Sequence, residues 1–262
     1  MTSHITDRSV PKPLEGKIAL ITGASKRIGR AIAIALAEEG VGIVAHDRSA
    51  LEGEIVKVCD EVAGCGAKSW KIIADLEKKE DYESLISRSI QTAGSLEILI
   101  NNASIFFPST IADVGFRDIT RHVQVNAWTP FVLCREFARL GGRGKIINLL
   151  DTRIAGYDRE HVAYILSKRM LATMTRMCAL EYAPAITVNG VAPGLILPPA
   201  GKDEDYLARL AQTMPLRRHG EPGDVTGAVL YLLGSDYITG QIIYVDGGQH
   251  LLEDGNGQDS NW

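Results

Sequence analysis

The sequence predicts an α/β fold of one domain, built as a doubly wound parallel sheet of about seven strands with helices on both faces. Two observations lead to this prediction. Short apolar runs alternate with longer helical patterns almost from end to end, and no internal repeat or linker divides the chain. Because crossovers between parallel strands are right-handed, this alternation winds helices onto both faces of one sheet.

Each strand is expected at a short apolar run, since the strands of a doubly covered parallel sheet are buried on both faces. The expected strands cover residues 18–22, 42–45, 69–74, 97–101, 145–150, 186–191 and 242–245. Each helix is expected where apolar residues recur with helical spacing between two such runs. The expected helices cover residues 31–37, 50–62, 82–93, 122–138, 163–182 and 222–233.

Three segments fall outside this alternation. The proline-containing stretch 193–205 is expected to be an irregular loop beyond the carboxyl end of its strand, where doubly wound folds bind ligands. Residues 1–13 are expected to form a flexible N-terminal arm and residues 253–262 a polar C-terminal tail. The domain itself is expected to span residues 14–252.

Composition excludes several classes of protein. The chain has 262 residues, 45% of them apolar and 23% charged, and a net charge of −4, which argues against a disordered chain or a fibre. This charge offers no general attraction to nucleic acid or to an anionic membrane. The four cysteines form no CxxC pair and lie near no histidine cluster, so no metal site is expected. Without a secretion signal or membrane span, a cytoplasmic protein is the default expectation.

A glycine-containing turn follows the first expected strand. It reads Thr22-Gly23-Ala24-Ser25-Lys26-Arg27-Ile28-Gly29. Glycines between a strand and a helix let the backbone approach a pyrophosphate, whose charge the helix N-terminus favours. The same glycines can serve only to make a tight turn, but the position near the chain start favours dinucleotide binding.

A tyrosine and a lysine stand four residues apart in the expected helix 163–182. This spacing puts Tyr164 and Lys168 on one face of the helix. A nearby ammonium favours the charged form of a phenol, so Lys168 is expected to lower the pKa of Tyr164 and let it pass a proton near neutral pH. A lone pair of this kind is more often a solvated helix face, so it needs support from other residues.

That support comes from motifs spread over the chain, which together resemble the short-chain dehydrogenase/reductase family. They are the Asn101-Asn102-Ala103 run, Asn126 in the next helix, the Asn189–Gly194 run and the Asp246-Gly247-Gly248 run. The resemblance extends from about residue 16 to residue 251 and implies a Rossmann-type fold. It further implies that Tyr164 is the proton donor, that Lys168 binds the nicotinamide ribose and tunes Tyr164, and that Asn126 supports a water relay.

Four departures from the common family pattern resemble the pteridine reductase and dihydromonapterin reductase branch. Arg27 replaces the middle glycine of the turn, and Ser104 replaces a glycine after Ala103. Asp151 replaces the usual serine and suits a substrate with N–H donors, although it can instead cap a helix or face solvent. Phe106 stands where that branch stacks its pterin, while Phe107 is expected to be a core residue.

The resemblance also indicates the rest of the binding site. The expected cofactor-binding residues are Gly23, Lys26, Arg27, Ile28, Gly29, Asp47, Arg48, Ser49, Asp75, Leu76, Asn102, Ala103, Ser104, Tyr164, Lys168, Pro193, Gly194 and Leu195. The expected substrate-binding residues are Ser104, Phe106, Asp151, Tyr164, Gly194 and Leu197, under a loop at 195–202 that closes over the small-molecule substrate.

The choice of dinucleotide depends on the end of the second strand. An acidic residue there binds a ribose 2′-hydroxyl and favours NADH, whereas an arginine holds the 2′-phosphate of NADPH. Asp47 and Arg48 stand side by side. NADPH is favoured, because Lys26, Arg27, Arg48 and Ser49 can surround a phosphate, while Asp47 keeps NADH possible.

The function expected from these residues is NADPH-dependent reduction of a pterin-type substrate. A carbonyl reductase or alcohol dehydrogenase of the same family, acting on a 3-oxoacyl group, steroid or small ketone, is the alternative within enzymes. A non-catalytic dinucleotide-binding regulator is the alternative from another class. The resemblance also implies a homotetramer formed through the helices after strands four and five, with residues 250–253 close to a neighbouring subunit's substrate.

Overall fold

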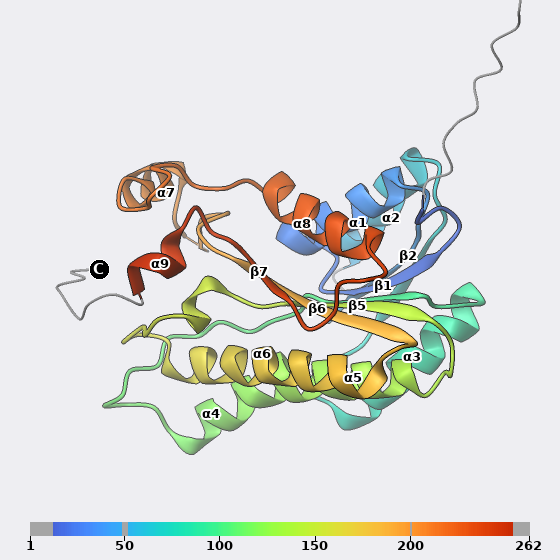
Figure 1. The fold of residues 1–262 in the computed structure, drawn as a ribbon, viewed down its shortest axis with the longest axis horizontal. Coiled ribbons are helices and arrows are strands. Elements are labelled where there is room, and N and C mark those ends of the chain that lie inside the picture. Colours follow the sequence, from blue (N-terminus) through green and yellow to red (C-terminus); the bar gives the residue numbers. More distant parts are fainter. Residues whose placement is uncertain (1–12, 49–51, 200, 254–262) are drawn as a thin grey trace, which may run out of the picture.

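The computed structural model describes residues 13–48, 52–199 and 201–253 (Figure 1). The strands are β1 (Ile18–Thr22), β2 (Gly42–Asp47), β3 (Ser69–Ile73), β4 (Ile98–Asn101), β5 (Gly144–Leu149), β6 (Ile186–Pro193) and β7 (Ile242–Val245). The helices are α1 (Arg27–Glu38), α2 (Glu52–Gly64), α3 (Lys79–Ala93), α4 (Phe116–Val123), α5 (Thr129–Ala138), α6 (Val162–Tyr182), α7 (Glu204–Ala211), α8 (Pro222–Gly234) and α9 (Gln249–Glu253). A π-helical turn, η1 (Gln124–Trp128), and a 3₁₀ turn, η2 (Thr152–Ile154), complete them.

The strands form one sheet of seven, in the order β3-β2-β1-β4-β5-β6-β7, and every pair is parallel. The predicted doubly wound fold is therefore confirmed. The chain moves outward from β1 in one direction to β3 and then returns to place β4 on the other side of β1. The crevice between the carboxyl ends of β1 and β4 is the place where such sheets bind ligands.

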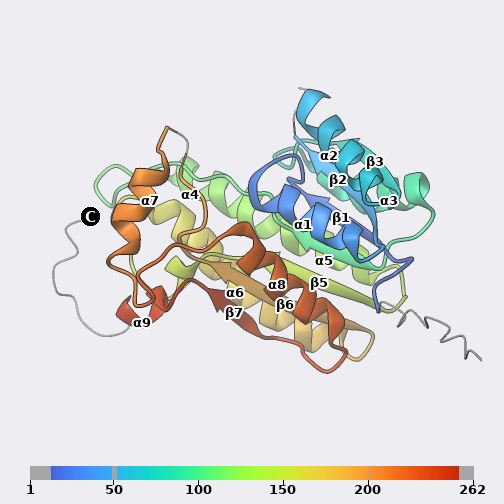
Figure 2. The same ribbon diagram turned by 90° about the horizontal axis from the view of Figure 1, so that it is seen from above.

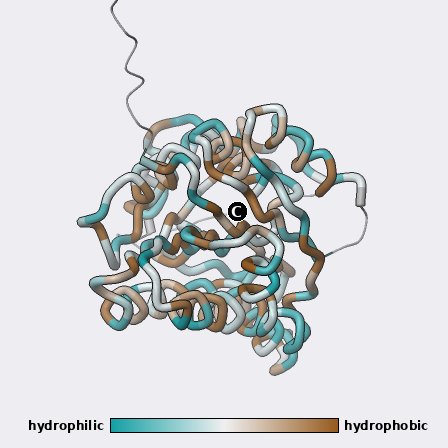
Figure 3. The backbone as a smooth tube through the Cα atoms, turned by 90° about the vertical axis from the view of Figure 1, so that its right-hand side faces the viewer, coloured by the Kyte–Doolittle hydropathy of each residue, from teal (hydrophilic) through white to brown (hydrophobic). Residues whose placement is uncertain are grey.

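Helices cover the sheet on both sides (Figures 1 and 2). Helices α1, α2 and α8 lie on one face, and α3, α4, α5 and α6 lie on the other. β1 shows why both faces are apolar, because Ala19 and Ile21 pack into the core under α1 while Leu20 packs into the core under α3. In Figure 3 the helices alternate hydrophobic and hydrophilic residues along the tube, as amphipathic surface helices do.

Three features differ from the sequence prediction. The helix expected over 122–138 begins at Phe116, and the π turn η1 divides it. The stretch 193–205 is irregular only in part, since β6 runs to Pro193 and α7 begins at Glu204, where the Asp203 side chain accepts a hydrogen bond from the Tyr206 N–H. α9 extends to Glu253, so this first residue of the expected tail ends a helix.

The two ends of the chain fall largely outside the described residues. The expected arm, residues 1–13, is described only at Pro13, and the remainder of the expected tail, residues 254–262, is not described. Within the described ranges, no helix is long and apolar enough to cross a membrane.

The turn between β1 and α1 is packed closely against β4. Gly23 has φ of 65°, a conformation that L side chains rarely adopt. A Cβ added to Gly29 would lie 2.1 Å from the Gly23 carbonyl oxygen and 2.5 Å from Asn102 Nδ2. Asn102, the residue after β4, donates from its Nδ2 to the carbonyls of Thr22 and Gly23 and so fixes the turn. The helix can come this close to the strand only without a side chain at Gly29.

Gly29→Ala is therefore expected to lower the free energy of unfolding by about 1–3 kcal/mol, the usual cost of overpacking. The matched control is Gly53→Ala, because Gly53 lies in α2 with nothing within 4 Å of an added Cβ. There the alanine is expected to add about 0.5–1 kcal/mol through helix propensity. Urea unfolding of both variants makes the comparison, and equal stabilities would contradict the close packing.

Candidate active site

The predicted tyrosine and lysine lie together at the carboxyl edge of the sheet. Tyr164 and Lys168 are on the same buried face of α6, and Asp151 follows the end of β5. The Tyr164 hydroxyl donates to Asp151 Oδ2 at 2.8 Å, and Lys168 Nζ donates to the Leu149 carbonyl at 2.7 Å. The structure thus brings the residues expected to be catalytic into one cluster.

The expected effect of Lys168 on Tyr164 is wrong for this structure. Burial, and then the adjacent Asp151 carboxylate, raise the pKa of Tyr164 well above its usual range. Both effects disfavour the phenolate, because they oppose a negative charge in an apolar site beside another negative charge. Burial lowers the pKa of Lys168 to about 8, partly offset by Asp151. Tyr164 is therefore held in its protonated form.

Asn126 lies in the π turn η1 and fixes the wall opposite α6. Its Oδ1 accepts from the Ile105 N–H at 2.8 Å and from the Ser104 hydroxyl at 3.1 Å, and its Nδ2 donates to Ser167 Oγ at 3.1 Å. The Ser104 hydroxyl also acts on Tyr164, where its hydrogen bond opposes the rise in pKa. π turns are frequent at functional sites, and here the turn directs Asn126 between β4's loop and α6.

Asp151 caps the turn after β5, one of the alternatives considered for it, and it also contacts Tyr164. Its Oδ1 accepts from the Arg153 N–H at 2.9 Å, which caps the turn η2, while its Oδ2 accepts from Tyr164. Its side chain is only 17% exposed, so the reading in which it merely faces solvent is excluded.

Three residues of this site were not identified from the sequence. The Arg153 guanidinium lies 3.5 Å from Asp151 Oδ2 and 3.2 Å from Asp158 Oδ2. Asp158 Oδ2 also lies 2.8 Å from His161 Nδ1. Burial raises the pKa of Asp158, but hydrogen bonds from His161 and the Glu160 N–H and the charge of Arg153 lower it overall. All three lie in the segment that joins Asp151 to Tyr164. Their position between these two residues is the only feature of the sequence that could have pointed to them.

Phe106 packs directly on this cluster. Its ring stacks on the His161 ring, with centroids 4.1 Å apart and planes 12° apart, and meets the Tyr164 ring edge-on at 4.7 Å. The ring remains 39% exposed beside the catalytic cluster. Phe107 is 46% exposed and contacts His122 and Arg121, so the expectation of a core residue is wrong for it.

The buried His46, which sequence reasoning also did not identify, holds the turn between β1 and α1. His46 Nδ1 accepts from the Gly23 N–H at 3.2 Å, and its Nε2 lies 3.0 Å from the Ala74 carbonyl. These two contacts assign the proton to Nε2. Burial lowers the pKa of His46 to about 4, so the ring is neutral at ordinary pH. A lone histidine at the end of an apolar strand gives little signal in a sequence.

Several residues expected to bind the cofactor are used by the fold itself. The Asn102 and Ala103 N–H groups both donate to Thr22 Oγ1, and Asn102's amide holds the turn. Leu76 is buried in the core, and its carbonyl accepts from Thr129, which leaves its side chain unable to reach a ligand. Pro193 ends β6 beside Val245. Ile28 packs against the core under α1.

The cations expected to surround a 2′-phosphate are not gathered in one place. Arg48 pairs with Glu77 at 2.9 Å and lies 3.4 Å from Asp75, and Glu77 also pairs with Arg121. Lys26 and Arg27 instead line a hollow on the other side of the turn, towards α2. Ser49 lies outside the described residues, and Asp47, the last residue of β2, is partly buried.

The loop after β6 lies over the turn. Gly194 packs so closely that an added Cβ would lie 2.6 Å from Asp246 Cβ, and the Leu195 carbonyl accepts from the Gly220 N–H. The Arg27 guanidinium donates to the carbonyls of Leu197 and Pro198. The sequence predicted that this loop closes over the substrate, and the structure places it beside the turn.

The segment after β7 makes hydrogen bonds within its own chain. Asp246 Oδ2 accepts from the Thr152 hydroxyl, the His250 N–H and His250 Nδ1, and the His250 ring stacks on Tyr244. Hydrogen bonds from Thr152 and His250 lower the pKa of Asp246 against the effect of its burial. His250 is thereby held near η2 of its own chain.

The residues at the turn fit a bound dinucleotide. α1 begins at Arg27 with no side chain capping its first N–H groups, and Gly23 and Gly29 leave no side chain over them. Uncapped N–H groups at a helix N-terminus are an anion-binding arrangement. Gly23, Lys26, Arg27 and Gly29 would hold the pyrophosphate at this turn.

Comparison with known proteins agrees with this arrangement. A family model described as enoyl-(acyl carrier protein) reductase matches residues 23–250. The structure of FolM alternative dihydrofolate reductase 1 from Brucella canis, complexed with NADP, has a TM-score of 0.86 at 30% identity, covering 92% of this chain and 96% of that one. A short-chain dehydrogenase/reductase from Serratia marcescens has a TM-score of 0.83 at 31% identity, covering 90% and 98%.

A further relative comes from sequence comparison. A protein described as ketoacyl reductase 2 of the granaticin polyketide synthase, from Streptomyces violaceoruber, is 34% identical over 249 residues, which are 91% of this chain and 98% of that protein.

The burial of His46 leads to a prediction about pH. The unfolded chain takes up a proton on this ring near pH 6.5, whereas the folded protein resists it down to about pH 4. The stabilisation is therefore complete above pH 6.5 and is lost as the pH falls towards 4. Between about pH 7.5 and about pH 5 the loss is about 2 kcal/mol. His46→Gln, which does not titrate, is expected to lack this part of the pH dependence in urea unfolding. Parallel losses in both proteins would contradict the assignment.

Proposed function

Since the chain belongs to the short-chain dehydrogenase/reductase family, we propose that it is an NADPH-dependent reductase of a pterin-type substrate. The observation that carries this proposal is the Asp151 carboxylate, 2.8 Å from the Tyr164 hydroxyl at the position where the family usually has serine. The similarity to FolM, described as an alternative dihydrofolate reductase, supports it.

A carboxylate at this position would select between substrates by its charge. An ionised Asp151 accepts hydrogen bonds only, so it attracts the N–H groups of a pterin ring and repels a bare ketone oxygen. Its Oδ1 is occupied by the Arg153 N–H, and its Oδ2 receives the Tyr164 hydroxyl and faces the guanidinium of Arg153. The proposed role therefore places a substrate N–H beside a carboxylate that is already oriented by Arg153 and Tyr164.

The protonation of Tyr164 fits reduction. Bound NADPH would supply a hydride to the carbon of a C=N bond, and the nitrogen of that bond must then gain a proton. Tyr164 carries this proton, because burial and Asp151 raise its pKa. Lys168, fixed on the Leu149 carbonyl, stands on the same helix face to orient the ribose and to balance the charge that Tyr164 acquires. Asn126 keeps the wall of Ser104 and Ile105 in place.

Phe106 supplies a surface for a flat ring. Its ring meets Tyr164 edge-on and stacks on His161, while the Arg153 guanidinium carbon lies over it, 5.3 Å from its centroid. A stacked substrate ring would therefore have to displace the Arg153 side chain or slide beside it. Offset stacking of a heteroaromatic ring on such a surface adds about 0.5–1.5 kcal/mol beyond burial. Ser104 and Gly194 are proposed to bind the same substrate, as is Leu197, although its side chain packs against the core under α1.

The preference for NADPH rests on the cations beside the turn. Lys26 and Arg27 line a hollow beside the turn, and Arg48 directly follows β2. Asp47, Asp75 and Glu77 oppose them, so the 2′-phosphate must draw Arg48 away from its carboxylate partners. The NADP in the FolM structure supports this choice, and NADH remains the alternative that Asp47 favours.

Reduction of a ketone is the second candidate. It is favoured by the relative described as a ketoacyl reductase, which shares 34% of its residues with this chain. The Tyr164 and Lys168 arrangement suits either substrate, so the two candidates differ only in what Asp151 and Phe106 select. A dinucleotide-binding regulator would bind NADPH without turning over any substrate.

We also propose that the protein forms a homotetramer through α4 and α6. The support is a set of apolar side chains exposed on these neighbouring helices, which include Phe116 on α4 at 82% and Leu180 on α6 at 84% exposure.

The proposed function is tested by measuring the rate of NADPH oxidation with a panel of dihydropterins, including dihydrobiopterin, and with a panel of small ketones. Turnover is expected with the pterins, and Asp151→Ser is expected to lower kcat/KM for them by about 10–100-fold, the cost of one charged hydrogen bond. Tyr164→Phe serves as the control for lost proton delivery and is expected to lower kcat by about 10²–10⁴-fold on any substrate. Turnover of ketones alone would refute the pterin proposal.

The stacking role of Phe106 has its own test. Phe106→Leu is expected to raise KM for dihydrobiopterin by about 3–10-fold, through loss of stacking, with little change in the Kd for NADP⁺. Phe107→Leu is the matched control, since Phe107 contacts His122 and Arg121 instead of the catalytic cluster. If both variants raise KM equally, the ring at 106 has no special part in binding.

A further inference from the structure

We propose that the Arg153 guanidinium is an internal competitor of the substrate, and that its displacement sets how tightly a flat ring with N–H donors binds. It contacts both groups that such a ring would use, the Asp151 carboxylate and the Phe106 ring. The proposal rests on the proposed function for the identity of the substrate, but the place of Arg153 can be tested without turnover.

One side chain makes both of these contacts. Arg153 NH1 lies 3.5 Å from Asp151 Oδ2, the same oxygen that accepts from the Tyr164 hydroxyl at 2.8 Å. Arg153 Cζ lies over the Phe106 ring, 5.3 Å from its centroid. A ring that stacks on Phe106 and donates to Asp151 must therefore break both contacts of the guanidinium.

A guanidinium has the chemistry of the ring with which it would compete. It is flat, it carries N–H donors in its plane and no acceptor, and it stacks on aromatic faces. The amino-substituted pyrimidine part of a pterin likewise has its nitrogens on a single carbon and N–H donors in the plane of the ring. A ketone has neither feature. Arg153 therefore favours a substrate whose flat, N–H-bearing edge can replace both of its contacts.

Arg153 can leave Asp151 and keep an ionic partner. Its Nε lies 3.2 Å from Asp158 Oδ2, and the same oxygen lies 2.8 Å from His161 Nδ1. Hydrogen bonds between ions are usually about 2.7–2.9 Å long, so the 3.5 Å contact with Asp151 is the looser of the two. The Arg153 side chain is 37% exposed and so already borders solvent. The guanidinium can thus turn away from Asp151 while Asp158 retains its Nε.

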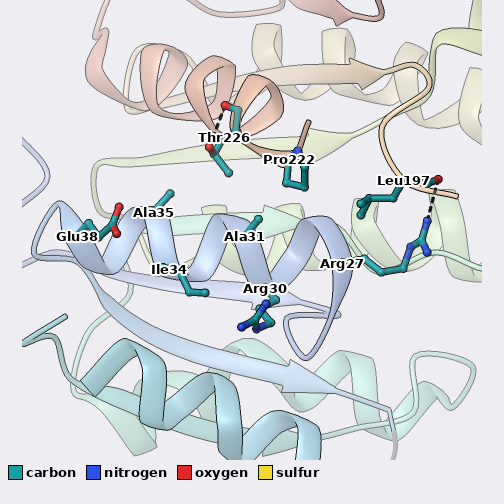
Figure 4. A pocket seen from close by; sticks show the side chains of 10 residues that line it. Arg27, Arg30, Ala31, Ile34, Ala35, Glu38, Leu197, Pro222 and Thr226 are labelled. Carbon is teal, nitrogen blue, oxygen red and sulfur yellow. Dashed lines mark hydrogen bonds between the residues drawn. The ribbon is translucent and has the colours of Figure 1, made fainter. Parts of the chain in front are cut away.

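Other arginines of the domain supply matched controls. Arg121 Cζ lies 5.0 Å from the centroid of the Phe107 ring, but Arg121 pairs with Glu77 and not with the catalytic cluster. Arg30 lies beside the groove between α1 and α8, on the face of the sheet opposite α6 (Figures 1 and 4). Of these three side chains, only Arg153 touches the proposed acceptor for a substrate N–H.

The competition is tested by isothermal titration of the full-length protein, saturated with NADP⁺, with 2,4-diaminopteridine. This probe has the flat ring and the N–H donors, and NADP⁺ has no hydride to give, so binding is measured without turnover. Arg153→Ala is expected to lower the Kd by about 3–30-fold, the combined cost of breaking a partly exposed ion pair and a cation–π contact. Arg121→Ala and Arg30→Ala are expected to bind the probe as wild type does.

A second probe, methylguanidinium, tests the place of Arg153 independently of any pterin. It is expected to bind Arg153→Ala, where it replaces the lost guanidinium, and to compete there with the pteridine. It is expected to bind neither wild type nor the double variant Arg153→Ala/Asp151→Asn. Arg153→Lys keeps the charge without the planar fork, and its Kd for the pteridine is expected between those of wild type and Arg153→Ala. This variant keeps the test open if the alanine variant fails to fold.

The outcomes separate this proposal from the proposed function. Equal pteridine affinity in wild type and Arg153→Ala, or an alanine variant that folds and binds neither probe, overturns the competition. Methylguanidinium binding to Arg153→Ala, with no pteridine binding to either protein, supports the place assigned to Arg153 and refutes only the pterin-type substrate.

Discussion

The molecule depends on how closely α1 approaches the end of β1. Gly29 packs against the Gly23 carbonyl, and side chains from β2, from the residue after β4 and from the end of β1 fix the turn between them. His46 accepts from the Gly23 N–H, Asn102 donates to the Thr22 and Gly23 carbonyls, and Thr22 receives the N–H groups at the start of the loop after β4. The polar groups of the turn and of these neighbours therefore satisfy one another, and the N-terminus of α1 keeps no side-chain cap.

That constraint also sets the position of the catalytic cluster. The loop after β4 starts on Thr22 and continues to Ser104 and Ile105, which are held by Asn126 from the π turn. Asn126 in turn donates to Ser167 on α6, the helix that carries Tyr164 and Lys168. These hydrogen bonds thus join the turn before α1 to the helix of Tyr164, the proposed proton donor, so that both ends of a bound cofactor would meet parts fixed relative to each other.

Much of this was predictable from the sequence, for reasons that are local. The strand and helix alternation, the turn at Gly23 and the Tyr164–Lys168 face depend on spacing along the chain, which a sequence displays directly. The π turn at Asn126 and the contacts of Arg27, His46 and Arg153 depend on neighbours distant in sequence. The raised pKa of Tyr164 could not be predicted either, because it follows from its burial and from an aspartate that only the fold brings within 2.8 Å.

Asp151 shows why a single exchange at this site can change the chemistry. A serine at the same place would leave Tyr164 without a neighbouring negative charge. The carboxylate instead raises the pKa of Tyr164 and lies close to Arg153. Arg153 also contacts Asp158, Asp158 contacts His161, and the His161 ring stacks on Phe106. The proposed acceptor for a substrate N–H and the proposed surface for a flat ring thus belong to one network of contacts, so under the pterin proposal a change at Asp151 would alter both.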